Sequence, residues 1–142
     1  MSTFLLELVT PEKVLLSEQV RAVRAPGIEG SFGVLAHHAP MMTALAVGLI
    51  KVEHANGDME YIAAGGGFME VNREKVIILA DTAERASDID VSRAEAAVAV
   101  AREHLAGGAA VDYEEARASL ERATNRLKIA QMQEAQEPAR RR

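Results

Sequence analysis

The fold is decided at residues 87–94, Ser87-Asp88-Ile89-Asp90-Val91-Ser92-Arg93-Ala94, where the composition of the chain changes. Eight of the ten glycines precede this stretch, and the other two are the adjacent pair Gly107-Gly108. Before it, apolar residues alternate along short runs separated by turn residues, which is typical of strands. After it, the chain is rich in alanine and charge, and apolar residues recur at helical spacing. We therefore predict an α+β protein with a β domain over residues 1–86 and a helical domain over residues 87–142.

The bulk composition of the 142 residues excludes several classes of protein. A net charge of −5 argues against binding to duplex nucleic acid. The chain has no cysteine, so disulfides and thiolate metal sites are excluded. No apolar run approaches the roughly 20 residues of a membrane-spanning helix, and the N-terminus lacks the basic region of a signal peptide. These features predict a soluble intracellular protein that reaches a membrane only through partners.

The β domain is predicted to be an antiparallel β-sandwich of about ten short strands. Asn56-Gly57 is a strong two-residue hairpin signal, and Gly65-Gly66-Gly67 predicts a further turn. Many short strands at close spacing favour a sandwich or barrel. The strand-like runs cover residues 4–9, 13–16, 20–25, 30–34, 41–46, 49–54, 59–63, 68–71 and 76–80.

Catalytic and metal-binding motifs are not recognisable in the sequence. A phosphate loop would need a helix and a Lys-Ser/Thr pair after the glycine triplet, but a strand follows instead. His37 and His38 point opposite ways on an extended segment, so they do not share one ion easily. His54 and His104 have no ligand-like neighbours at useful spacing, and all four histidines are interpreted as surface or turn residues. No nucleophile with its base is recognisable, so we expect a non-catalytic protein without a metal site.

The second half is predicted to be an antiparallel hairpin of two helices. Asp88 or Asp90 caps the first helix, Gly107-Gly108 ends it, and Asp112 with Glu115 forms a capping box for the second. Both apolar seams are spaced alternately by three and four residues, which indicates heptad packing. The seams are Val91, Ala94, Val98, Ala101 and Leu105 in the first helix, and Tyr113, Ala116, Leu120, Ala123, Leu127 and Ala130 in the second.

The seams also place a charged cluster on one flank of the hairpin. Alanine at alternate seam positions limits the buried area, so we expect the hairpin to be weakly held. The heptad positions bring Asp90, Arg93, Arg122 and Arg126 to the same flank, and several guanidinium groups together bind phosphates well. The alternative is a solvated face in which each charge pair contributes only a few tenths of a kcal/mol.

Four segments carry a resemblance to a known family. Each motif alone is weak, but their order, their spacing and the helical hairpin behind them resemble the ε subunit family of bacterial F-type ATP synthases over almost the whole chain. His37 stands where that family often has glycine before a His-Ala-Pro segment. The similar segments are Glu29–Leu35, His38–Thr43, Gly66–Val71 and Leu79–Glu84.

The resemblance implies a non-catalytic subunit of the rotating central stalk. Such a subunit couples rotation of the γ subunit to the ring of c subunits in a proton- or sodium-translocating complex, and it lies peripherally on the cytoplasmic face of the cell membrane. In that family the hairpin has a folded state and a state extended toward the α and β subunits, and the extended arm inhibits ATP hydrolysis. Exposed apolar residues in the family-like segments are the expected contacts with γ and the c ring, and Met41, Met42 and Phe68 are the candidates.

The resemblance also implies a regulatory nucleotide site. Some bacterial members bind ATP on the folded hairpin, and Ile89, Asp90, Arg93 and Ala94 match their motif, as Arg122 and Arg126 match their arginine pair. A further basic position of that pattern is occupied here by Glu115. No cofactor is required, and ATP is expected as a regulatory ligand. The alternative function is a stand-alone nucleotide-sensing protein of the same architecture without a rotary partner.

Overall fold

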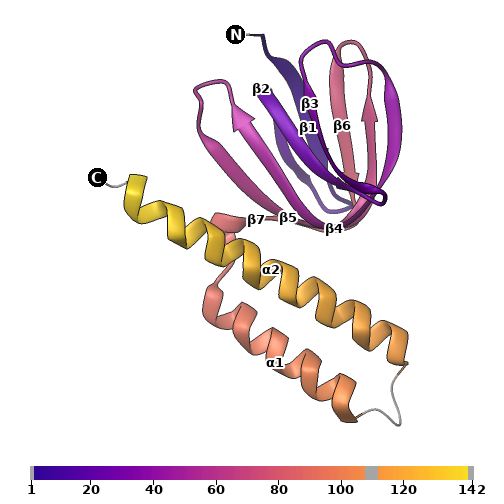
Figure 1. Ribbon diagram of the computed structural model, residues 1–142, viewed down its shortest axis with the longest axis vertical. Helices are drawn as coiled ribbons and strands as arrows, with labels where there is room; N and C mark the ends of the chain where they lie inside the picture. Colours follow the sequence, from indigo (N-terminus) through magenta and orange to yellow (C-terminus); the bar gives the residue numbers. More distant parts are fainter. Residues whose placement is uncertain (1, 108–111, 141–142) are drawn as a thin grey trace. The chain divides into compact units, whose positions relative to one another are not determined.

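The computed structural model describes residues 2–107 and 112–140, with side chains as far as residue 135. The chain folds as two compact units, Met1–Arg85 and Ala86–Arg142. The first unit is built of strands and the second of helices, which confirms the predicted α+β class with a β-sandwich followed by two helices (Figure 1).

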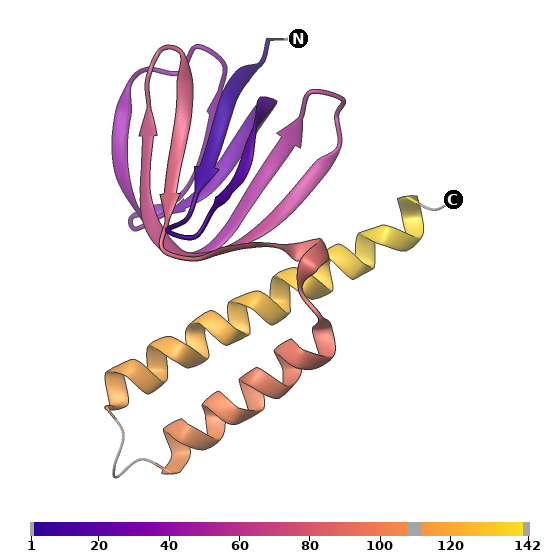
Figure 2. The ribbon, with the colours of Figure 1, turned by 180° about the vertical axis from the view of Figure 1, so that it is seen from behind.

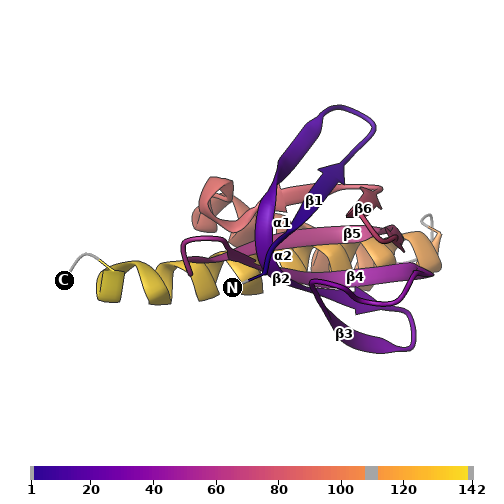
Figure 3. The same ribbon diagram turned by 90° about the horizontal axis from the view of Figure 1, so that it is seen from above.

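The described strands of the first unit form one sheet that closes on itself. β1 pairs with both β2 and β6, so the path β1-β6-β5-β4-β2 returns to its starting strand, while β3 lies on β2 and β7 on β5. Figure 3 shows this curvature from above. The β1–β6 pair is parallel, and the other described pairs are antiparallel. The strands are β1 (Phe4–Val9), β2 (Val14–Gly27), β3 (Gly30–Leu35), β4 (Met41–His54), β5 (Met59–Val71), β6 (Lys75–Ala80) and β7 (Ala83–Arg85).

The strand count is lower than predicted because neighbouring runs join into long, bent strands. The runs 13–16 and 20–25 both belong to β2, and the runs 41–46 and 49–54 both belong to β4. The predicted hairpin at Asn56-Gly57 is confirmed, because Gly57 has a φ of 91° and the Asn56 side chain accepts a hydrogen bond from the Asp58 amide at 2.9 Å.

The predicted turn at Gly65-Gly66-Gly67 is wrong, because all three residues lie inside β5. Gly66 and Gly67 have φ values of 102° and 138°, and a Cβ on Gly67 would lie 2.1 Å from the carbonyl oxygen of Leu79. The glycines therefore bend the strand and admit a close neighbour instead of reversing the chain. Residues 62–64, before the bend, pair with β7, and residues 67–71, from the bend onward, pair with β6.

The core of the first unit lies between the opposed walls of the sheet. It consists of aliphatic side chains and Met69, in keeping with an aromatic content of only 4%. Alternation along the strands brings every second residue inward. The largest fully buried side chains of this core are Leu6, Leu8, Ile50, Ile62, Met69 and Ile78.

The second unit begins with a 3₁₀ turn, η1 (Ala86–Asp88), and continues with α1 (Val91–Gly107) and α2 (Tyr113–Arg140). The two helices run antiparallel, with the start of α1 beside the middle of α2 (Figures 1 and 2). In α1 the buried residues are Ala94, Val98 and Ala101, all from the predicted seam. Gly107 ends α1 as predicted, whereas Gly108 lies outside the described residues.

The seam of α2 differs from the prediction at its first residue. Ala116 and Ala130 are buried, but Tyr113 is 63% exposed. Tyr113 is the first residue of the helix, so the seam begins one turn later, at Ala116. Ile129 is buried although it was not assigned to the seam.

Candidate functional site

Four of the six predicted site residues lie at the start of α1, with Ile89 and Asp90 just before the helix and Arg93 and Ala94 in its first turn. Asp90 is the N-cap, because its Oδ1 accepts a hydrogen bond from the Arg93 amide at 3.0 Å. Its carbonyl oxygen accepts the first helical bond from the Ala94 amide at 2.9 Å. Of the two predicted caps, Asp90 therefore has this role, and Asp88 lies in the preceding 3₁₀ turn.

These four residues divide into buried and exposed groups. Ala94 is fully buried and Ile89 is 7% exposed, so both contribute mainly to packing. The Ile89 amide donates to the carbonyl oxygen of Ala86 at 3.2 Å, which fixes the short connection between η1 and α1. Asp90 and Arg93 are exposed at the surface of the helix. A carboxylate and a guanidinium are thus held within one turn by backbone geometry.

The other two predicted site residues lie one turn apart on α2. Arg122 is exposed and Arg126 is half-buried. Residues four apart on a helix share a face, and the middle of α2 lies beside the start of α1 (Figure 2). Asp112 caps this helix as predicted, since its Oδ1 accepts from the amides of Glu114 and Glu115 at 3.0 and 3.4 Å.

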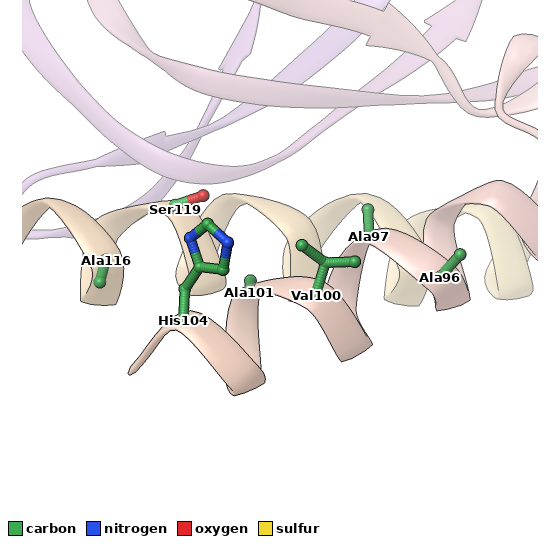
Figure 4. A pocket seen from close by; sticks show the side chains of 7 residues that line it. All are labelled: Ala96, Ala97, Val100, Ala101, His104, Ala116 and Ser119. Atoms are coloured by element: carbon green, nitrogen blue, oxygen red, sulfur yellow. The ribbon is translucent and has the colours of Figure 1, made fainter. Parts of the chain in front are cut away.

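A groove opens between the two helices nearer their connection. Its volume is about 370 Å³, and Val100 on its wall is 52% exposed. Figure 4 shows the side chains of Val100 and His104 rising from α1, with Ser119 on α2. Sequence reasoning missed this groove, although Val100 is an apolar residue outside the predicted seam. The lining residues are Ala96, Ala97, Val100, Ala101, His104, Ala116 and Ser119.

An apolar patch on the outer face of the sheet is the second candidate site. Phe68 pairs with Ala44 on one side and Leu79 on the other, and Leu79 in turn pairs with Val9. This row crosses four strands, and Met42 lies in the adjacent row on the same face. Phe68 is 58%, Leu79 56% and Met42 69% exposed. We call Met42, Phe68 and Leu79 the outer patch.

The outer patch corrects the predicted set of exposed apolar residues. Met42 and Phe68 are exposed as predicted, but Met41 packs against the core. Adjacent residues on a strand point to opposite faces, so both methionines could not face outward. Leu79 was missed, although its position opposite Phe68 follows once the register is known.

The four histidines occupy different environments. His37 has a left-handed backbone with a φ of 68°, in a loop between β3 and β4. The interpretation of His54 as a surface or turn residue is wrong. It ends β4, its side chain is 19% exposed, and its ring contacts the carboxylates of Glu18 and Glu60. Glu60 lies six residues away across the Asn56-Gly57 hairpin, whereas Glu18 is distant in sequence and is brought to His54 only by the pairing of β2 with β4.

Two negative findings concern metals and membranes. Among the described residues, no three histidine, aspartate or glutamate side chains gather in a way that would hold a metal ion. None of the helices in the described part of the chain is long and apolar enough to cross a membrane.

Two family models together match residues 3–131. The ATP synthase delta/epsilon chain beta-sandwich domain matches residues 3–86, and the delta/epsilon chain long alpha-helix domain matches residues 87–131. The ATP synthase epsilon chain of Desulforamulus reducens is 46% identical over 127 residues, which are 89% of this chain and 96% of the relative. The epsilon chain of Nitratidesulfovibrio vulgaris strain DP4 is 48% identical over 125 residues, covering 87% and 92%.

Solved structures give the same fold. A chain from the Euglena gracilis mitochondrial ATP synthase, in a structure of OSCP, F1 and the c-ring, has a TM-score of 0.78 and 27% identity. The match covers 88% of this chain and 79% of that one. A chain of the Tetrahymena thermophila enzyme, from its central stalk and c-ring, has a TM-score of 0.58 and 14% identity, covering 92% and 96%, and supports the fold alone.

Proposed function

This chain belongs to the delta/epsilon family of ATP synthase subunits, and from that membership we propose that it couples rotation of the γ subunit to the c ring. Like its relatives it is a non-catalytic subunit of the complex. In this proposal the sheet unit binds γ and the c ring, and the complex holds the chain at the cytoplasmic face of the cell membrane. ATP synthesis and ion transport are activities of the assembled complex.

The observation that carries the proposal is the outer patch on a family-matched sheet unit. Three large apolar side chains that are each more than half exposed on one sheet face favour a protein interface, because isolated soluble surfaces rarely gather them. Met42 adds a flexible side chain that adapts to a partner surface. Phe68 lies between Ala44 and Leu79 in the row and is the expected anchor.

The test is co-purification of the full chain with γ, comparing the wild type with Phe68→Glu. We expect a one-to-one complex for the wild type. A charge at the centre of a dry interface should weaken the complex by about 2 kcal/mol or more, roughly thirtyfold. Val100→Glu is the matched control, because it places the same charge at an exposed apolar residue of α1. Equal binding by Phe68→Glu and wild type would exclude the outer patch as the interface.

We further propose that the helical unit restrains ATP hydrolysis when it extends toward the α and β subunits. The small buried side chains of α1 support this role, since a weakly held hairpin exchanges conformations at low cost. Basic residues of α2, including the exposed Lys128, are suited to an acidic segment of a β subunit.

ATP is proposed as the ligand that favours the folded hairpin. Asp90, Arg93, Arg122 and Arg126 would contact the nucleotide, with Ile89 and Ala94 packing beneath it. The capped start of α1 beside the middle of α2 supports this arrangement. The ligand can shift the hairpin only by its difference in affinity for the two states. Nucleotide sensing without a rotary partner is the alternative, and failure of the wild-type chain to bind γ would favour it.

A further inference from the structure

Four charged side chains of the first unit contact one another in series near the end of β4. The Nε2 atom of His54 lies 2.7 Å from Oε1 of Glu60, and Nδ1 of the same ring contacts the carboxylate of Glu18. The other oxygen of Glu60 accepts a hydrogen bond from Nη1 of Arg85, and Nη2 of Arg85 donates to the Leu15 carbonyl oxygen at 2.8 Å. We call Glu18, His54, Glu60 and Arg85 the clasp.

The clasp connects four strands, and the last of them, β7, directly precedes the helical unit in the sequence. Glu18 belongs to β2, His54 to β4, Glu60 to β5 and Arg85 to β7. β7 has only three residues and pairs with β5. Arg85 is the last residue of β7, and Ala86 begins the helical unit. Because β7 forms few backbone hydrogen bonds, the contacts of the Arg85 side chain with Glu60 and Leu15 are important for keeping this strand paired with β5.

The ring of His54 contacts both of its carboxylates favourably only when it is protonated. A neutral imidazole has one N–H donor and one lone pair, whereas the cation has two donors. Loss of the proton therefore turns a lone pair toward Glu18 or Glu60. Histidine side chains commonly change charge between about pH 5 and 8. The clasp has two carboxylates and one guanidinium, so it is neutral with the cation and carries one negative charge without it.

The charged residues closest to His54 in the sequence, Glu53 and Asp58, each have a partner. Arg21 on β2 lies 3.8 Å from the carboxylate of Glu53, the residue before His54. Asp58 lies in the turn after β4, where its carbonyl oxygen accepts from the His54 amide at 2.8 Å, and its side chain accepts from Asn56 at 3.1 Å. Glu18 and Glu60 are therefore the charged side chains that contact the His54 ring.

We propose that His54 is a proton-dependent switch that sets how firmly β7, the last strand before the helical unit, stays paired with β5. With the ring protonated, the imidazolium bridges Glu18 and Glu60, and Glu60 is fixed in place to hold Arg85. With the ring neutral, one bridge is lost, Glu60 is held less firmly, and β7 opens more often. The mechanism uses residues outside both the outer patch and the nucleotide-site residues.

Hydrogen exchange of the full chain at pH 6 and pH 8, corrected for the intrinsic amide rates, tests this proposal. Local opening of a short strand is measured directly by the protection of its amides. For the wild type, protection at Ala83–Arg85 relative to the β4–β5 pairs should fall by about two- to fivefold from pH 6 to pH 8, the range for a partly exposed ion pair. His54→Gln replaces the imidazole with a neutral amide. In this variant the protection of Ala83–Arg85 should therefore be the same at both pH values.

Two further variants keep the test decisive. His104→Gln removes an exposed histidine of α1 and should keep the wild-type response. Glu18→Gln changes a side chain that is 46% exposed and leaves the Glu60–Arg85 contact intact, so it should fold and show a reduced response. The proposal is overturned if the wild type shows no change with pH at β7, or if His54→Gln and Glu18→Gln retain the full change.

Discussion

The sheet unit and the first helix of the helical unit bury very different side chains, although α2 also buries Ile129. Large fully buried residues such as Ile50, Ile62 and Ile78 fill the closed sheet, whereas α1 buries Ala94, Val98 and Ala101. At about 0.8 kcal/mol per buried methylene, each isoleucine contributes roughly 2 kcal/mol more than an alanine. The sheet unit is therefore suited to be a rigid scaffold, and the helical unit is suited to be an arm whose folded state is easily exchanged.

The largest expected effect comes from a large-to-small substitution in the core of the sheet unit. Ile62→Ala should lower the free energy of unfolding of the sheet unit by about 2–5 kcal/mol, because the closed sheet cannot collapse onto the cavity. The matched change in the arm, Val98→Ala, should cost only roughly 1–2 kcal/mol. Urea denaturation followed by signals from each unit measures both. Equal losses would remove the distinction between scaffold and arm.

The next effect concerns the arm as a nucleotide site. Arg126→Ala should weaken ATP binding by about 1.5–3 kcal/mol if a charged hydrogen bond to phosphate is lost. Lys128→Ala, which removes an exposed charge from the same helix, is the control and should bind ATP like the wild type. Isothermal calorimetry measures both constants. If the wild type does not bind ATP at millimolar concentration, the charged residues of the flank form a solvated surface only.

A smaller effect on stability is expected from a substitution at the N-terminus of α1. Asp90→Ala removes the N-cap hydrogen bond to Arg93 and should destabilise the hairpin by about 0.5–2 kcal/mol. The sheet unit should keep its stability, because the residue belongs to the helical unit. Helical circular dichroism and hydrogen exchange in α1 report the loss. Asp90→Asn should restore most of it, since asparagine caps equally well, and failure of that rescue would argue against a capping role.

The smallest expected effect is a gain in the stability of the sheet unit. His37 has a φ of 68°, a conformation that costs most residues about 1–2 kcal/mol. His37→Gly removes that strain but increases the freedom of the unfolded chain, which offsets about 0.4–1 kcal/mol. The sheet unit should therefore gain about 0.5 kcal/mol, seen as a raised thermal midpoint. His38→Gly is the contrasting change, and a gain of the same size there would contradict the backbone explanation.

Much of this contrast was predictable from the sequence because it depends on local patterns. The change at Ser87, the Asn56-Gly57 hairpin, the cap at Asp112 and a cap at Asp88 or Asp90 are each encoded within a few residues. The seam of α1 followed from spacing alone. The family resemblance extended these local predictions to the role of the whole chain, and the matches over residues 3–131 confirm the family.

The features that were missed depend on pairing between distant residues. Gly65-Gly66-Gly67 has the composition of a turn, and only its packing against β6 and the segment after it makes it a bend within a strand. Leu79 joins the outer patch through its register with Phe68. His54 gains Glu18 and Glu60 as partners only when β2, β4 and β5 are side by side. Tertiary contacts of this kind leave no periodic signal in one sequence.

Truncation of the chain after Ser87 tests the division between scaffold and arm most directly. ATP hydrolysis is measured in complexes assembled with the full chain and with the truncated chain. The sheet unit has its own closed core, so the truncated chain should fold and still bind γ. The account predicts that hydrolysis then rises because the restraining arm is absent. Unchanged hydrolysis in a complex that retains the truncated chain would contradict an inhibitory role of the arm.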